Sequence, residues 1–265
     1  MKIIACIPAR YASVRFPGKV LAKETGRYLV QHTYEQACKA KLPFKVIIAA
    51  DDEKIASAAR QFGAECIMTG SQHNSGTDRI AEAVAGLEAD IIVNVQADEP
   101  EIEPETIDCV AQLLVDNPSC PMATMAGPFD NVRRIADPNI VKVITDTTGR
   151  AIYFSRSPIP YDRSAGEDAH QGLSTDTGRG AAGIGPAENY LRHIGIYAYR
   201  KNFLLEFTAL PAGRLEKIEK LEQLRAIEAG FPILVGRVKH IRPGIDTPEQ
   251  YAEFVKKYKQ QTSGI

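Results

Sequence analysis

The loop from Arg10 to Lys19 places three cations, Ser13 and a glycine within ten residues, directly after an apolar run. Cationic side chains and loop N–H groups bind phosphate oxygens, so this loop suits a triphosphate. It is not a Walker A loop, because GxxxxGK[ST] is absent, and no GxGxxG follows the run. The alternative interpretation is a solvated basic loop without a ligand.

Two isolated carboxylates follow other apolar runs. Asp98 stands after the run Asp90 to Val95, and Asp246 stands in the segment Gly244 to Pro248. Mg²⁺ is held in proteins by one or two carboxylates together with substrate phosphates. Two ionised carboxylates ~4 Å apart repel by roughly 4 kcal/mol at an effective dielectric of about 20, so without metal we expect the pair to destabilise the site. A helix N-cap is the alternative for each, and for Asp246 it is the simpler one.

A third segment, Gln72 to Arg79, opens a helix. Ser75 and Thr77 can cap that helix, and the free N–H groups of its first turn can hold a phosphate or a base edge.

The second half of the chain offers polar groups suited to a substrate carboxylate. Arg156, Arg163, Arg192 and His193 bracket the stretch Ser164 to Glu188, which holds six glycines and is expected to be a mobile loop that orders when substrate binds. A substrate carboxylate prefers bidentate arginine, whereas a lone His193 is more often structural.

A single helix is expected over Leu215 to Ala229. On it Glu216, Glu219 and Gln223 would share one face, where polar groups need partners. Sugar hydroxyls would serve, and a solvated face or a dimer rim is the alternative.

The elements that position these residues alternate between strand and helix patterns. In the first half, strands are expected at 2–8, 45–50, 65–69 and 90–95, and helices at 29–40, 53–62, 78–86 and 104–116. In the second half, strands are expected at 139–144, 151–154, 194–199 and 233–238, with a last helix from Pro248. This order is typical of a doubly wound, mostly parallel α/β sheet, which binds ligands at the carboxyl ends of its strands. We expect one α/β domain over 1–265, with a smaller α+β insertion at about 123–210.

Composition narrows the class of partner. The 265 residues carry 32 basic and 33 acidic side chains, a net charge of −1, which gives no reason to expect nucleic acid or membrane insertion. Five cysteines without a CxxC pair favour a reducing cytoplasm.

Seven segments, taken together and in order, resemble the 3-deoxy-manno-octulosonate (KDO) cytidylyltransferases over nearly the whole chain. They are IPARYASVRFPGK, SGTDR, NVQADEP, YFSRSPIPYDR, RHIGIYAYR, LEKIEKLEQLR and GIDTPE. The chain departs from the family's usual pattern at Gly18-Lys19-Val20-Leu21, at Gly26 to Val30, and at Ala97, which replaces a glycine of the family. Its glycine-rich loop is also longer than in the family.

The resemblance implies transfer of CMP from CTP to the anomeric hydroxyl of KDO, with Mg²⁺, in lipopolysaccharide biosynthesis, by a cytoplasmic homodimer. It makes residues 1–265 a single nucleotidyltransferase domain and assigns sugar binding and dimerisation to the insertion at about 123–210. It assigns CTP binding to Pro8, Ala9, Arg10, Ser13, Lys19, Ser75, Gly76, Arg79 and Gln96. It assigns catalysis to Arg15, Lys19, Asp98 and Asp246, the two aspartates holding the metal. It assigns the sugar to Arg156, Arg163, His193, Tyr197, Glu216 and Gln223.

Three alternatives stay open at this point. A cytidylyltransferase for sialic acid would do the same chemistry, but RHIGIYAYR and LEKIEKLEQLR argue against it, whereas 8-amino-KDO is a closer analogue. A nucleotide-sugar-binding glycosyltransferase would consume an activated sugar, whereas the loop from Arg10 to Lys19 suits a free triphosphate. A non-enzymatic nucleotide sensor would need no paired carboxylates.

Overall fold

The computed structural model describes residues 1–13, 15–165 and 184–262, and these form two compact units. Unit 1 comprises Met1–Asp116, Ile196–Thr208 and Arg242–Ile265, and unit 2 comprises Asn117–Gly195 and Ala209–Ile241. The prediction of one domain with an insertion at about 123–210 stays a prediction.

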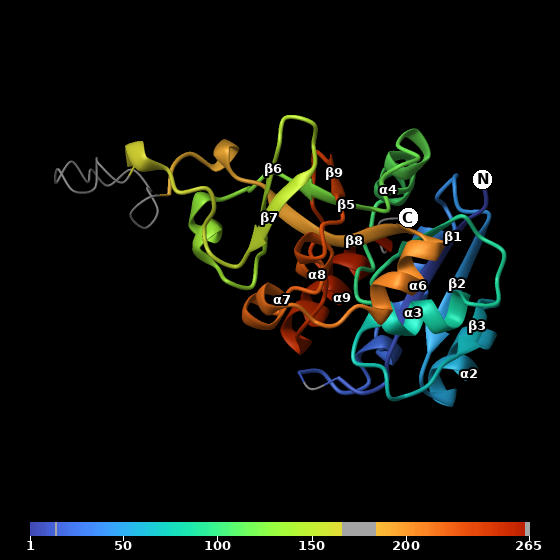
Figure 1. The fold of residues 1–265 in the computed structure, drawn as a ribbon. Helices are drawn as coiled ribbons and strands as arrows, with labels where there is room; N and C mark the ends of the chain where they lie inside the picture. The colour runs from blue at the N-terminus through green and yellow to red at the C-terminus, as the bar shows by residue number, and fades with distance from the viewer. Residues whose placement is uncertain (14, 166–183, 263–265) are drawn as a thin grey trace. The chain divides into compact units, whose positions relative to one another are not determined.

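Unit 1 is built on parallel strands in the order β3-β2-β1-β4, and Figure 1 shows β1, β2 and β3 in blue to cyan with α2 and α3. The strands are β1 (Ile3–Ala9), β2 (Lys45–Ala50), β3 (Glu65–Met68) and β4 (Ile91–Asn94). The end of β8 (Arg192–Arg200) pairs antiparallel with β4. Isoleucine and valine fill β1 and β4, which are almost completely buried, as parallel strands covered on both faces require.

The helices of unit 1 connect these strands and follow them. They are α1 (Leu29–Ala37), α2 (Glu53–Gln61), α3 (Gly76–Val84), α4 (Pro104–Asp116), α6 (Lys201–Ala209) and α9 (Pro248–Thr262), with the short 3₁₀ helix η1 (Lys19–Leu21). The α/β class and the mostly parallel sheet are therefore confirmed, and α6 is an addition that the sequence pattern did not reveal.

Unit 2 holds a smaller mixed arrangement. Strands β5 (Met122–Gly127) and β9 (Ile233–Arg237) are parallel, and β6 (Lys142–Thr145) forms an antiparallel hairpin with β7 (Ala151–Ser155). The remaining elements are η2 (Val132–Ala136), η3 (Ala187–Asn189), α7 (Arg214–Glu219) and α8 (Leu224–Glu228). Strand β5 was not expected, because the sequence MATMAG offers one β-branched residue and much alanine and glycine.

The prediction of one helix over Leu215 to Ala229 is wrong. The helix ends at Lys220, whose φ of 54° is left-handed, and a new helix starts four residues later. Arg156 donates from Nε to the Glu219 carbonyl at 2.7 Å and from Nη2 to the Lys220 carbonyl at 3.3 Å. These bonds satisfy the carbonyls at the break, so a contact distant in sequence overrides the local apolar pattern. Glu216 and Gln223 therefore do not share one helix face.

Most of the glycine-rich stretch Ser164 to Glu188 lies outside the described residues. Its expected mobility and its ordering on substrate binding therefore stay predictions. In the part of the chain that the structure describes, every helix is too short or too polar to cross a membrane.

Candidate functional site

A pocket of about 320 Å³ in unit 1 gathers the segments that the sequence singled out. It lies where β1 and β4 end, at the start of α3, and beside the segment before α9. Eleven predicted residues line it: Pro8, Arg10, Ser13, Arg15, Lys19, Ser75, Gly76, Arg79, Gln96, Asp98 and Asp246. Val20, His73, Asn74 and Ala97 complete the wall. Of the residues assigned to the nucleotide, to catalysis or to the metal, Ala9 alone does not line this pocket. It is the last residue of β1 and is fully buried.

Lys19 stands at the centre of the charged end of this pocket. Gly18, with a φ of +68°, caps η1 in a left-handed conformation that favours glycine and delivers Lys19 into the pocket. The Lys19 ammonium donates to Asp98 Oδ2 at 2.6 Å and to the Ile245 carbonyl at 2.8 Å. It lies 3.6 Å from Asp246 Oδ1, so one ammonium bridges both carboxylates.

Asp246 reaches Asp98 because its segment runs alongside the loop after β4. The Ile245 N–H donates to the Asp98 carbonyl at 2.8 Å. Asp246 Oδ1 then accepts from Arg15 Nη2 at 2.8 Å. The hydroxyl of Thr247, rather than the Asp246 carboxylate, accepts a hydrogen bond at the start of α9, from Gln250 N–H at 3.4 Å. The N-cap alternative for Asp246 is therefore wrong, and its carboxylate is available to the pocket.

The two carboxylates fit a metal site that substrate oxygens complete. They converge on one cation, which is the arrangement that Mg²⁺ needs from two protein ligands. Among the described residues, no group of three or more His, Cys, Asp or Glu side chains could hold a metal alone. Lys19 and Arg15 lie against the two carboxylates and offset their negative charges, so the chain itself reduces the repulsion expected of the pair without metal.

The opposite wall of the pocket is the N-terminus of α3. Ser75 caps the helix by accepting from Asp78 N–H at 3.1 Å, as expected. A Cβ on Gly76 would lie 3.1 Å from Pro8 Cγ, so glycine lets the helix start approach the end of β1. The N–H groups of this first turn and the positive end of the helix favour a negatively charged ligand group.

Arg79 closes this wall and is almost completely buried. Its Nη1 donates to Thr69 Oγ1 at 2.8 Å, and its Nη2 donates to Asp51 Oδ2 at 3.1 Å. Sequence reasoning missed Asp51, although it stands directly after β2, at the strand end where a ligand-binding sheet places its polar groups.

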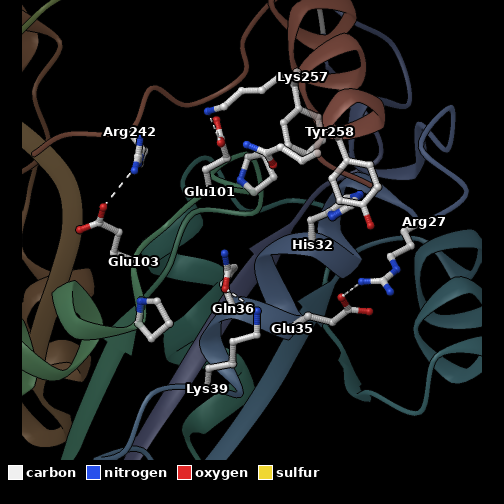
Figure 2. Close-up of a pocket in the computed structure, with 14 residues that line it drawn as sticks. Arg27, His32, Glu35, Gln36, Lys39, Glu101, Glu103, Arg242, Lys257 and Tyr258 are labelled. Atoms are coloured by element: carbon white, nitrogen blue, oxygen red, sulfur yellow. Dashed lines mark hydrogen bonds and ion pairs between the residues drawn. The ribbon is translucent and has the colours of Figure 1, made fainter. Parts of the chain in front are cut away.

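A second pocket of unit 1, of about 340 Å³, has a different character (Figure 2). Its rim carries three ion pairs, Arg27–Glu35 and Lys257–Glu101 at 2.5 Å and Arg242–Glu103 at 3.4 Å. Beside them, the ring of the buried His32 makes T-shaped contacts with the rings of Phe254 and Tyr258. The cations of these pairs are matched by carboxylates, and no predicted site residue lines this pocket.

Comparison with known proteins decides the family. A cytidylyltransferase family model matches residues 4–241. The 3-deoxy-manno-octulosonate cytidylyltransferase of Syntrophotalea carbinolica is 46% identical over 94% of this chain and 95% of that protein. The 3-deoxy-manno-octulosonate cytidylyltransferase of Geobacter sulfurreducens is 44% identical over 98% of this chain and 100% of that protein. The chain belongs to the 3-deoxy-manno-octulosonate cytidylyltransferase family.

Solved structures agree with this membership. The structure of CMP:2-keto-3-deoxy-manno-octonic acid synthetase complexed with CTP has a TM-score of 0.87 at 38% identity, covering 98% of this chain and 100% of that one. A cytidylyltransferase from Leptospira borgpetersenii has a TM-score of 0.58 at 16% identity, over 99% of this chain and 96% of that one, and shows the fold alone.

The other residues that the KDO cytidylyltransferase resemblance assigned lie mostly in unit 2, where two of them are already engaged. Besides its bonds at the helix break, Arg156 donates from Nη1 to the Pro138 carbonyl at 2.8 Å. Glu216 accepts from Arg225 Nε at 2.8 Å and Nη2 at 2.7 Å, a bidentate pair that is mostly buried. These contacts hold unit 2 together.

His193 and Gln223 have fewer contacts. His193 lies edge-on to Phe154 with ring centroids 4.9 Å apart, and its Nε2 is 3.0 Å from Thr124 Oγ1. Burial lowers the pKa of His193 to about 3, so the imidazole is neutral at pH 7 and supplies no positive charge to a sugar carboxylate. The Gln223 side chain is 4% exposed, and its buried Nε2 has no hydrogen-bond partner among the described residues.

The last two predicted sugar residues occupy other places. Arg163 is exposed and directly precedes the glycine-rich stretch. Tyr197 belongs to unit 1, where it pairs with Asn94 of β4 and its ring lies 5.9 Å from that of Tyr199.

Proposed function

We propose that the chain transfers CMP from CTP to the anomeric hydroxyl of KDO and releases CMP-KDO and pyrophosphate. The observation that supports this most is the bridging of Asp98 and Asp246 by Lys19 within a pocket that also presents Arg10 and Arg15. Paired carboxylates beside several cations suit a triphosphate that carries a metal ion. Relatives that are 44–46% identical bear the name of this activity.

The triphosphate would lie between the cationic loop and the start of α3. Arg10 and Ser13 line this side of the pocket, and Ser75 and Gly76 open the helix on the other. Nothing in the described residues pairs Arg10 with a carboxylate, so its guanidinium is available to phosphate oxygens. We expect CTP to be preferred strongly over ATP, because the polar groups after the strands, Gln96 among them, would read the base edge.

We propose that Asp98 and Asp246 hold Mg²⁺. When bound there, the metal would supply positive charge to the oxygens of the phosphoryl group in transfer. Lys19 and Arg15 then exchange their carboxylate partners for phosphate oxygens, which places both cations where pyrophosphate leaves.

At the α-phosphorus, the reaction forms one bond and breaks one. The anomeric oxygen of KDO bonds to this phosphorus, the bond from the phosphorus to the bridging oxygen of pyrophosphate breaks, and the proton of the hydroxyl passes to water. The side chains contribute position and charge, which account for most of the catalysis of phosphoryl transfer.

We propose that KDO is recognised by side chains that include Arg163, His193 and Gln223. The Gln223 Nε2 atom supports this assignment, because it has no acceptor among the described residues and a sugar hydroxyl would supply one. Sugar contacts of Tyr197, Arg156 and Glu216 stay predictions. For the last two, a role in holding the unit together is supported by their internal bonds.

One assay tests the reaction and the choice of sugar. The protein is incubated with Mg²⁺ and CTP or ATP, and with KDO, 8-amino-KDO or sialic acid, while pyrophosphate release is followed. Release with CTP and KDO supports the proposal, and faster release with another sugar acid reassigns the substrate. Binding of CTP without release for any sugar would favour a nucleotide sensor.

The resemblance further suggests a homodimer in the cytoplasm, serving lipopolysaccharide assembly. Light scattering coupled to size-exclusion chromatography tests the first point, since a dimer elutes with twice the mass of the chain.

A further inference from the structure

Asp51 is a buried carboxylate behind the wall of the nucleotide pocket. Its side chain is 11% exposed, and each of its two oxygens has a different partner. Oδ1 accepts from Tyr11 N–H at 2.9 Å, and Oδ2 accepts from Arg79 Nη2 at 3.1 Å. One side chain at the end of β2 therefore connects the loop after β1 with helix α3.

The contact with Tyr11 fixes the part of the loop that carries the pocket residues Arg10 and Ser13. Tyr11 stands between Arg10 and Ser13, and this part of the loop has no regular secondary structure. Its ring also lies under the Lys54 ammonium, 4.3 Å from the ring centroid. The hydrogen bond to Asp51 and this cation–π contact tether the loop to the β2–α2 connection.

The contact with Arg79 fixes the opposite wall. The Arg79 side chain is 4% exposed, and Asp51 is the carboxylate that neutralises its charge. Breaking such a pair leaves an uncompensated charge in a buried place, so the guanidinium would have to move. Because Thr69 Oγ1 and the Gly70 carbonyl hold the other nitrogen, at 2.8 and 3.4 Å, any movement changes how Arg79 faces the pocket.

We propose that Asp51 is a positioning residue for the nucleotide, which sets the spacing between the two walls that receive it. This inference rests on the proposed function of the pocket. Asp51 is not among the residues that line the pocket, so it acts through Tyr11 and Arg79. The Asp51–Arg79 pair is net neutral, so Arg79 offers a ligand directed N–H donors rather than a net positive charge.

The chain supplies a matched control for testing this role. Asp52 follows Asp51 directly and caps α2 by accepting from Lys54 N–H at 2.8 Å. Asp51→Asn and Asp52→Asn therefore remove the same charge at adjacent positions. Asparagine caps a helix about as well as aspartate, so Asp52→Asn should leave the pocket unchanged. Asp51→Asn keeps one acceptor oxygen but turns an NH₂ group toward either Arg79 or Tyr11, both of which are donors.

The measurement is CTP affinity by titration calorimetry without sugar, together with kcat and KM. We expect Asp51→Asn to weaken CTP binding by about tenfold or more, the usual size of such indirect effects. We expect Asp52→Asn to stay within about twofold. The loss should appear in the KM for CTP rather than in the KM for KDO, which a general loss of folded protein would not produce. Equal affinities of the two variants would overturn the proposal.

A second variant covers the case in which Asp51→Asn does not fold. Asp51→Glu keeps Arg79 paired but adds one methylene between β2 and the two donors. We expect a folded protein with CTP affinity reduced about threefold or more, and wild-type affinity in this variant would overturn the proposal. If the unaltered protein binds no CTP, the proposed function fails and this inference fails with it. If it binds CTP and the Asp51 variants match their control, this inference alone fails.

Discussion

The two units present their polar side chains in different ways. In unit 1, Arg15 and the two aspartates stand on loops, Lys19 opens η1, and the ion pairs of these four residues are with one another. A ligand can therefore replace these ion pairs one at a time. In unit 2, Arg156 donates to backbone carbonyls and Glu216 is locked to Arg225. The same residue types therefore serve a site in one unit and the fold in the other, and what distinguishes them is the partner rather than the sequence pattern.

The largest effect should come from the carboxylates of unit 1. Asp98→Asn and Asp246→Asn should fold normally, because asparagine is nearly isosteric with aspartate. Each should lower kcat by about 100-fold or more at ordinary Mg²⁺, since stabilisation of the transferring group would fall. A steady-state Mg²⁺ titration checks this. Near-normal activity of Asp246→Asn across that titration would leave Asp98 as the only protein ligand.

Substitutions of Arg156 and Gln223 should show whether these polar side chains of unit 2 stabilise the fold. Arg156→Gln removes three bonds to carbonyls and should lower the free energy of unfolding by about 2 kcal/mol, given ~1.5–3 kcal/mol for a typical bond to a charged group and partial exposure. Gln223→Leu removes a buried N–H group without a partner, so its stability should be unchanged or higher.

Kinetic measurements on the Gln223 variant distinguish a role in sugar binding from a role in stability. Gln223→Leu should raise the KM for KDO by about tenfold, the cost of roughly one hydrogen bond, while CTP affinity stays constant. Chemical denaturation and steady-state kinetics measure the two properties. A destabilised Gln223→Leu with a normal KM for KDO would mean that this side chain, like Arg156, supports the fold.

Each unit contains a buried histidine whose pKa is lowered. Burial lowers the pKa of His32 in unit 1 to about 4, and that of His193 in unit 2 to about 3, against 6.5 for the ordinary side chain. The unfolded chain binds these protons more readily, so stability is complete above pH 6.5 and falls as the pH drops toward the folded pKa values.

The slope is at most about 1.4 kcal/mol per pH unit for each histidine. His32→Gln and His193→Gln should each flatten the dependence of unfolding free energy on pH between 6 and 4. Denaturant unfolding at several pH values checks this. An unchanged slope in one variant would exclude that histidine, and unchanged slopes in both would show that acidic groups alone cause the loss.

The smallest effect concerns the helix break. Lys220 adopts a φ of 54°, which costs a residue with a side chain about 1 kcal/mol that glycine avoids. Lys220→Gly should therefore stabilise the protein by roughly 0.5 kcal/mol, after the greater freedom of glycine in the unfolded chain is subtracted. Thermal unfolding measures the gain, and kcat and KM should not change. A loss of stability would mean that the Lys220 side chain contributes contacts that offset its strained backbone.

Local pattern was enough to place most of the sheet of unit 1. β2 and α4 have the expected bounds, and β1 and β4 lie within one residue of them, because buried β-branched runs and helix caps are local signals. Strand β5 and the break at Lys220 were missed, since β5 is rich in alanine and methionine and the break depends on Arg156.

The site shows the same division. The segments that line the pocket of unit 1 were found because each follows a strand or opens a helix. Asp51 was not found, although it too follows a strand, because its importance lies in two contacts with residues far along the chain. Likewise, the sequence positions of Glu216 and Arg225 do not indicate that the two side chains form an ion pair. From the sequence alone, the Glu216 carboxylate could equally bind a ligand.

Lys19 gives the nucleotide pocket a counter-ion that belongs to the chain itself. Because its ammonium lies between Asp98 and Asp246, a chelator should leave the melting temperature of the free protein unchanged. A divalent cation must displace that ammonium, so Mg²⁺ alone should bind weakly. A triphosphate offers the displaced ammonium new partners, and each ligand should therefore raise the affinity of the other by the same factor. Reciprocal titrations of Mg²⁺ and CTP would measure this linkage directly, and Lys19→Met should abolish most of it.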